Sequence, residues 1–298
     1  MPATILPAPK VLLGGLNFPE CPRWHQNKLY FSDMHAHKIM TVDLQGKSET
    51  ILTLNTAEYN DRPAGIGFLA DGSFLFVAMR TRKLLRYANR TITLVADLGA
   101  FAAGMINDME VDSKGRAYIG GRGAKPDGTW IAWGSIILVT PDGKARVVAT
   151  DIHGPNGAGF TAGEKTFILA ETHGNKISAF NVEPDGALTH RRVFAETGPH
   201  KADGICVDAE GAVWVCSPLG KEAFRMKEGG EITHRIVYTD RSPVACVLGG
   251  PDGRTLFLTN SRFDLPNMSS LKGGDDDKRT TAVGWIEMIH VDVPGPHA

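Results

Sequence analysis

A hairpin-like motif recurs six times along the chain, and this repeat constrains the fold more than any other feature. In each copy a turn is followed by a short apolar strand that ends in an aromatic residue. Asp71-Gly72 and Asp252-Gly253 are turns of this kind, and glycine suits them because it accepts the positive φ of tight hairpins. The strand-end aromatics are Tyr30, Phe76, Tyr118, Phe167, Trp214 and Phe257, at spacings of 46, 42, 49, 47 and 43 residues.

A period in the forties with several strands per unit predicts propeller blades rather than a helical solenoid, because helical periodicity is weak throughout. Six units fill the chain, so we expect an all-β, six-bladed β-propeller that forms one domain over residues 1–298. The stretch from Thr4 to Leu13 is expected to supply an outer strand to the last blade and close the ring. Two segments exceed the repeat: residues 120–134, a candidate lid loop, and residues 264–284, a long loop in the last blade.

The composition of the chain limits the classes of partner that we expect it to bind. The 32 Lys plus Arg nearly balance 33 Asp plus Glu and form no basic run, so we expect no nucleic-acid or membrane partner. No window is long and apolar enough for a transmembrane helix. The four cysteines have neither CxxC spacing nor the density of a disulfide scaffold, which is typical of a reducing compartment. We therefore predict a cytoplasmic monomer or small homo-oligomer that acts on a small molecule.

Polar residues interrupt the repeat at one register. Counting back eleven residues from the aromatics leads to Gly65, Asn107, Asn156, Asp203 and Cys246, and Glu20 lies ten before Tyr30. Equivalent positions on the innermost strands of a propeller converge near the axis, so two carboxylates and two amides are expected around one centre. Asn-Asp and Asn-Gly are also ordinary turn dipeptides, but four such positions in register favour a site. Oxygen ligands of this kind suit Ca²⁺, Mg²⁺ or Mn²⁺, which predicts one divalent metal ion in the axial tunnel.

Four ordered motifs resemble the signatures of the SMP-30/gluconolactonase/luciferin-regenerating-enzyme family of six-bladed, metal-dependent hydrolases. They are Phe18-Pro19-Glu20-Cys21-Pro22-Arg23-Trp24, Ile106-Asn107-Asp108, Gly154-Pro155-Asn156-Gly157 and Ala202-Asp203-Gly204-Ile205. The resemblance implies that Glu20, Asn156 and Asp203 ligate the metal, while Asn107 and Asp108 face the substrate, with Asn107 close enough to join the coordination sphere. Ca²⁺ is the first candidate ion, and Zn²⁺, Mn²⁺, Mg²⁺ or Fe²⁺ are alternatives.

The chain departs from the family pattern at two positions. Cys21 stands where the family often has Gly, and Met105 stands where many sugar-lactone members carry Arg. Loss of that guanidinium removes a bidentate partner for sugar hydroxyls or a carboxylate. We therefore expect an apolar or aromatic lactone or ester to be preferred.

Other side chains are candidates for lining the pocket. Phe18, Trp130 and Trp133 are expected to border the apolar mouth, while Arg62 or Arg122 could instead supply the missing guanidinium. Cys246, in the axial register, is expected to be a pocket wall, and a reactive thiol is the alternative.

Together these residues predict metal-dependent hydrolysis of a lactone or related ester. The ion would polarise the carbonyl while a carboxylate activates water, with Asp203 the first choice and Asp108 the second. Two alternatives remain open. One is an organophosphate-type esterase on the same scaffold, and the other is a non-catalytic, metal-stabilised ligand-binding propeller.

Overall fold

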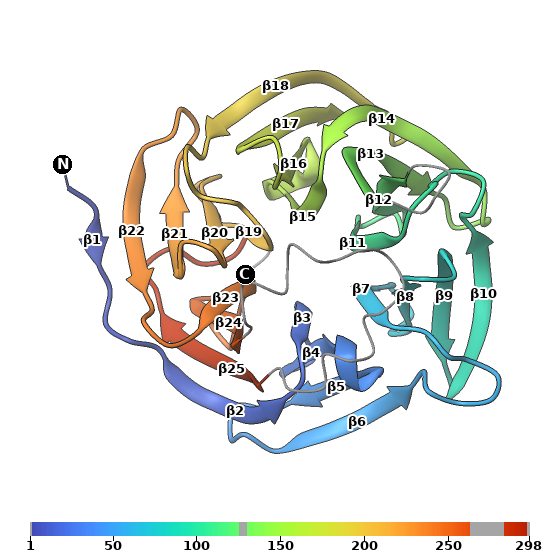
Figure 1. Cartoon of the computed structure of the whole chain (residues 1–298), viewed down its shortest axis with the longest axis horizontal. Helices are drawn as coiled ribbons and strands as arrows, with labels where there is room; N and C mark the ends of the chain where they lie inside the picture. Colours follow the sequence, from blue (N-terminus) through green and yellow to red (C-terminus); the bar gives the residue numbers. More distant parts are fainter. Residues whose placement is uncertain (1, 125–129, 263–282, 297–298) are drawn as a thin grey trace.

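The computed structural model describes residues 2–124, 130–262 and 283–296, whose strands form six sheets around a central axis (Figure 1). The predicted all-β, six-bladed β-propeller is confirmed. From the axis outward, the first sheet consists of β3 (Pro19–His25), β4 (Lys28–Asp33), β5 (Lys38–Val42) and β6 (Ser48–Thr53). The second consists of β7 (Pro63–Phe68), β8 (Phe74–Ala78), β9 (Lys83–Ala88) and β10 (Thr91–Asp97). The third consists of β11 (Ile106–Val111), β12 (Ala117–Ala124), β13 (Trp130–Val139) and β14 (Ala145–His153).

The remaining sheets follow the same order. The fourth consists of β15 (Pro155–Phe160), β16 (Thr166–Glu171), β17 (Lys176–Val182) and β18 (Leu188–Glu196). The fifth contains β19 (Ile205–Val207), β20 (Val213–Ser217), β21 (Glu222–Met226) and β22 (Ile232–Val237). The sixth contains β23 (Ser242–Gly249), β24 (Thr255–Arg262) and β25 (Val283–His290). Two short 3₁₀ helices are present in the described residues, η1 (Met34–Ala36) and η2 (Ala162–Glu164).

The N-terminal segment closes the ring. Strand β2 (Lys10–Leu16) pairs antiparallel with β25 and completes the last blade, which confirms the predicted closure for the second part of the stretch from Thr4 to Leu13. The residues before it pair with a different blade, which the sequence did not indicate. Strand β1 (Thr4–Ile5) adds in parallel to β22, the outer strand of the preceding blade. The N-terminus therefore bridges two blades.

The core is divided into six apolar clusters, each packed between two neighbouring sheets. The strand-end aromatics lie on the second strand of each sheet, and all except Tyr30 are fully buried in these clusters. Tyr30 is half-buried and packs edge-on against Phe68 of the next blade, with ring centroids 4.8 Å apart. Its neighbour Phe31 takes the fully buried position between the sixth and first blades.

The two segments that exceed the repeat are only partly described. Most of residues 120–134 belongs to the β12–β13 hairpin rather than to a loop, while residues 125–129 lie outside the described residues, as does the side chain of Trp130. Residues 263–282, which include nearly all of the long loop predicted over 264–284, also lie outside them. The role of 120–134 as a lid stays a prediction.

Buried ion pairs stabilise the turns of the inner hairpins. Asp208 accepts the backbone N–H groups of Glu210 and Ala212 and pairs with Arg225, whose Nε lies 2.6 Å from Oδ2. Both side chains are almost inaccessible to solvent. Asp112 repeats the arrangement in the third blade with Arg116.

We expect Arg225→Met to lower the free energy of unfolding by about 3–5 kcal/mol, because it leaves Asp208 as an uncompensated buried charge. Arg192→Met, which removes the exposed pair with Glu228, should cost less than about 1 kcal/mol. Urea denaturation of both variants measures the difference. Equal losses would contradict this account of the turn.

Candidate functional site

A break in strand pairing places polar residues at the start of the innermost strands. Five of these strands shift register against their neighbours where the predicted site residues lie. The shifts fall between Glu20 and Arg23, Pro63 and Ile66, Ile106 and Met109, Pro155 and Ala158, and Pro243 and Ala245. In the remaining blade, Asp203 and Gly204 directly precede β19. Bulges of this kind re-aim side chains away from the regular alternation of a strand.

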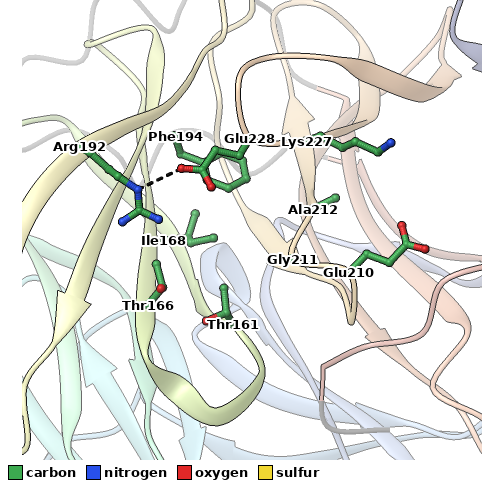
Figure 2. Close-up of a pocket in the computed structure, with 10 residues that line it drawn as sticks. All are labelled: Thr161, Thr166, Ile168, Arg192, Phe194, Glu210, Gly211, Ala212, Lys227 and Glu228. Carbon is green, nitrogen blue, oxygen red and sulfur yellow. Dashed lines mark hydrogen bonds and ion pairs between the residues drawn. The ribbon is translucent and has the colours of Figure 1, made fainter.

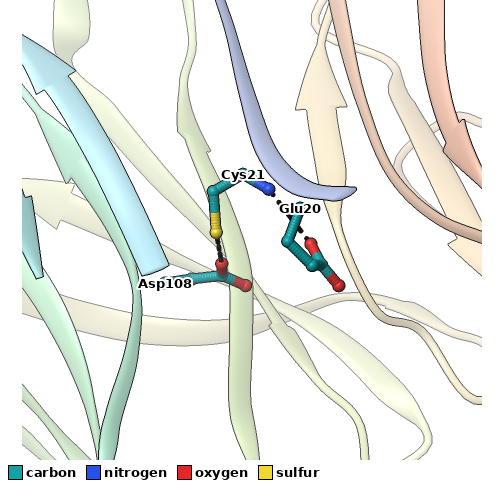
Figure 3. Close-up of side chains that lie close together, drawn as sticks. All are labelled: Glu20, Cys21 and Asp108. Carbon is teal, nitrogen blue, oxygen red and sulfur yellow. Dashed lines mark hydrogen bonds between the residues drawn. The ribbon is translucent and has the colours of Figure 1, made fainter. Parts of the chain in front are cut away.

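Glu20, Cys21 and Asp108 form one side of the centre (Figure 3). The Cys21 thiol donates to Oδ1 of Asp108 at 2.8 Å, and the Cys21 backbone N–H donates to Oε2 of Glu20 at 3.1 Å. Ligand atoms of the three residues all lie within 4.8 Å of one another. Burial, followed by the nearby carboxylates, raises the pKa of the Cys21 thiol well above its usual range, so it stays a proton donor.

Asn156 and Asp203 form the other side. The Asn156 amide donates to the Thr172 hydroxyl at 3.0 Å, and that hydroxyl donates to the carbonyl of Ala202 at 2.6 Å. The Asn156 amide also hydrogen bonds to the Asp203 carboxylate. The two inner strands meet without room for a side chain here, because a Cβ on Gly157 would lie 2.4 Å from the backbone nitrogen of Ile205.

Burial raises the pKa of all three carboxylates, and neighbouring carboxylates raise it further at Glu20 and Asp203. Burial, then repulsion from Asp203 and Asp108, raises the pKa of Glu20 well above its usual range. Burial, then Asp108, raises the pKa of Asp203 to about 7. Burial also raises the pKa of Asp108, although the Cys21 thiol, Arg23 and Arg122 oppose it.

Arg122, on β12, is a basic group common to all three carboxylates. Burial lowers its own pKa, while Asp203, Asp108 and Glu20 raise it. Arg23 acts on Asp108 as well, but it pairs with Glu110 at 2.9 Å, so the three buried carboxylates remain under-compensated. The centre therefore has the donor set and the charge that a hard divalent cation requires, so the residues present fit such an ion.

Met105 and Arg122 are neighbours across the β11–β12 ladder. The backbone N–H of Arg122 donates to the carbonyl of Met105 at 2.9 Å, and the Met105 side chain packs against the apolar cluster of the second and third blades. Arg122 acts on the three carboxylates of the centre from the strand next to position 105. This geometry favours the alternative in which Arg122 supplies the missing group over a purely apolar pocket.

Other predicted residues lie as follows. Asn107 is half-buried beside Asp108 in the β11 bulge, and Arg62 is buried directly before β7.

The placement of Cys246 needs correction. It pairs with Leu258 beyond the β23 bulge and is buried between the fifth and sixth blades, with its Sγ 3.5 Å from that of Cys206. Phe257 pairs with Val247, ten residues earlier, whereas Tyr118 pairs with Glu110, eight residues earlier, so a count of eleven from Phe257 stops at Cys246, before it reaches the bulge at Val244.

Cys21 is the residue whose contribution sequence reasoning missed. Its φ is 52°, in the left-handed region that favours glycine, and its side chain is buried against Asp108. The one available signal was that the family often has Gly there.

We expect Cys21→Gly to be more stable than Cys21→Ala by about 0.5–1 kcal/mol. Glycine relieves the left-handed strain that alanine retains, and neither variant keeps the thiol. Chemical denaturation of the pair isolates the backbone effect. An alanine variant as stable as the glycine variant would contradict it.

A pocket of about 390 Å³ lies at the opposite end of the inner strands, between the fourth and fifth blades (Figure 2). Thr161 and Thr166 beside the β15–β16 turn and Gly211 in the β19–β20 turn line it, whereas Asn156 and Asp203 lie at the other ends of these strands. Its Arg192 and Glu228 pair with each other at 3.0 Å. We therefore place the candidate site at the carboxylate centre.

The fold and this centre define a six-bladed β-propeller with a buried carboxylate site at the start of its innermost strands. A family model described as the SMP-30/gluconolactonase/LRE-like region matches residues 18–262, and the chain belongs to this family. In the part of the chain that the structure describes, no helix is long and apolar enough to cross a membrane.

Individual relatives agree over most of their length. A 6-deoxy-6-sulfogluconolactonase of Pseudomonas putida is 26% identical, covering 82% of this chain and 83% of the relative. A pentonolactonase of Haloferax volcanii is 25% identical, covering 93% and 91%. Among solved structures, a calcium-binding protein, regucalcin, from Agrobacterium tumefaciens superposes with a TM-score of 0.75 at 20% identity, covering 98% and 99%.

Proposed function

We propose that the chain is a metal-dependent lactonase. The observation that carries this proposal is the convergence of Glu20, Asp108 and Asp203 with Arg122 in one buried centre. Two lactonases among the relatives support the reaction class. A small-molecule lactone is the proposed partner, and four free cysteines support a cytoplasmic location.

Glu20, Asn156 and Asp203 would hold the ion. When bound, a divalent cation at this position supplies positive charge to the lactone carbonyl oxygen as negative charge develops there. Ca²⁺ is the first candidate because the donors are carboxylate and amide oxygens. Mn²⁺, Mg²⁺, Zn²⁺ and Fe²⁺ are the alternatives.

The protein's own groups would do the remaining work. Asp203 accepts a proton from the attacking water, since its carboxylate has a pKa raised toward neutrality by burial and by Asp108. Asp108, oriented by the Cys21 thiol, is the second candidate acceptor. Asn107 and Arg122 would bind and orient the substrate.

A pH-stat screen tests the function directly. Lactones, aryl esters and phosphotriesters are supplied to chelator-treated protein with and without each metal, and proton release is followed. We expect metal-restored opening of lactones. Turnover of phosphotriesters alone would favour the esterase alternative, and absence of turnover for every substrate would favour a non-catalytic binding protein.

A further inference from the structure

Basic side chains border the carboxylate centre along the third, fourth and fifth blades. We call Arg122, His153, His173 and Lys201 the basic rim. The backbone N–H of His173 donates to the carbonyl of His153 at 3.0 Å. Trp133, whose side chain is 49% exposed, presses its ring edge-on against His153, with centroids 3.6 Å apart. His173 is also exposed, so this part of the rim is open to solvent.

The rim is tied to the centre by short contacts. The Thr172 hydroxyl links the Asn156 amide to the Ala202 carbonyl. His173 follows Thr172 in the chain, and Lys201 precedes Ala202. Both basic residues are therefore one position away from a bridge that touches a proposed metal ligand. Lys201 itself is half-buried and donates to the Asn175 side chain.

The rim itself is basic, and the carboxylate beside it, Glu171, which accepts the backbone N–H of His153 at 2.9 Å, is paired with Arg191 at 2.7 Å. Burial, then Arg122, Lys201 and His153, lowers the pKa of His173, so the charged neighbours that act on it are all basic. Arg122 also acts on Glu20, Asp108 and Asp203 and so is the member of the rim that adjoins the centre. The two cationic side chains, Arg122 and Lys201, with histidine N–H donors beside them, raise the local affinity for an anion.

We propose that the basic rim binds an anionic substituent of the substrate, so that the substrate class is a lactone carrying a carboxylate or sulfonate group. The inference rests on the proposed function, because it assumes that the lactone ring lies at the carboxylate centre. The anionic group then lies toward His173 and Lys201, with Arg122 between the two ends of the molecule. Charge-assisted hydrogen bonds of this type fix both orientation and affinity.

A simpler role exists for Arg122 alone, which is to offset the three carboxylates. That role requires nothing of Lys201 or His173. The two explanations therefore separate at these residues, since only anion recognition makes them matter for substrate choice.

The experiment compares two lactones of the same ring, glucono-1,4-lactone and glucaro-1,4-lactone, which differ in a terminal hydroxymethyl or carboxylate group. We expect metal-loaded wild type to prefer the acidic lactone by about tenfold or more in kcat/KM. Lys201→Met should remove most of that preference, and the double variant with His173→Gln should remove the rest. Added salt should weaken the preference in wild type.

Lys227→Met is the matched control, because it removes the same charge from the opposite end of the inner strands. It should leave the preference unchanged. Equal turnover of the two lactones, or a loss in Lys201→Met that is the same for both, overturns anion recognition while leaving the lactonase proposal standing. Turnover of neither lactone with any metal overturns both.

Discussion

Replacing Asp203 by Asn, with the enzyme saturated in metal, is expected to lower kcat for lactone opening by about 10²- to 10⁴-fold. The amide keeps an oxygen donor for the ion but cannot accept a proton from water. The carboxylate form is the active one, so kcat/KM in wild type should fall as pH drops through the pKa of this group. That pKa is raised to about 7 in the ion-free site, and a nearby cation lowers it, so the acid limb should lie at or below about pH 7.

Asp108→Asn is the matched comparison, since it removes the neighbouring carboxylate of the same centre. We expect a smaller loss of kcat, because the thiol-bonded Asp108 is the second candidate acceptor. Equilibrium dialysis should accompany the kinetics, so that lost metal is not mistaken for lost chemistry. If Asp203→Asn retains kcat within about fivefold at saturating metal while Asp108→Asn does not, the two roles are exchanged.

The repeat was enough to predict the architecture because each blade carries its own signal. A turn that contains glycine and a strand-end aromatic recur in almost every unit, and burial of those aromatics between sheets is what makes the repeat visible in the sequence. Tyr30 is the exception, since Phe31 takes the buried position in the first blade. The parallel pairing of Thr4–Ile5 with β22 depends on a distant blade and leaves no local pattern.

The site was predictable only in part, because the strand-end aromatics do not all pair at the same distance along the chain. Glu20, Asn156 and Asp203 stand close to the common register, and counting along the chain therefore found them. Phe257 pairs with a residue ten positions earlier and Tyr118 with one eight positions earlier, which is why the same count ended at Cys246, in the inter-blade core, and did not reach the bulge.

Spatial neighbours on different strands were also hidden. Arg122 follows Met105 by seventeen residues in the sequence, yet the two share a backbone hydrogen bond across β11 and β12. The same holds for Cys21 and Asp108, which belong to different blades.

Chelator-treated wild type is expected to lose stability as pH rises, the reverse of what ordinary ion-paired carboxylates produce. Burial, then repulsion from Asp108, raises the pKa of Asp203 from 3.8 to about 7 in the folded protein, so folding favours the protonated form. The resulting stabilisation is present below pH 3.8 and is lost as pH rises through about 7. Glu20 and Asp108, with pKa values also raised chiefly by burial, act in the same direction.

Thermal or urea unfolding at about pH 5 and about pH 8 measures this loss, which should amount to a few kcal/mol. A divalent ion at a hundred times its Kd should restore about 2.7 kcal/mol at the higher pH, because it binds the folded state and relieves the repulsion.

Glu171 opposes the trend: burial raises its pKa, but Ser178, the His153 backbone and Arg191 together lower it below its usual range, so its contribution is lost on acidification. Asp203→Asn isolates the effect, since it keeps Glu171 and removes the carboxylate with the pKa near 7. Chelated wild type and Asp203→Asn with the same pH dependence would show that the centre carries no such electrostatic strain, and the argument for a cation there would fail with it.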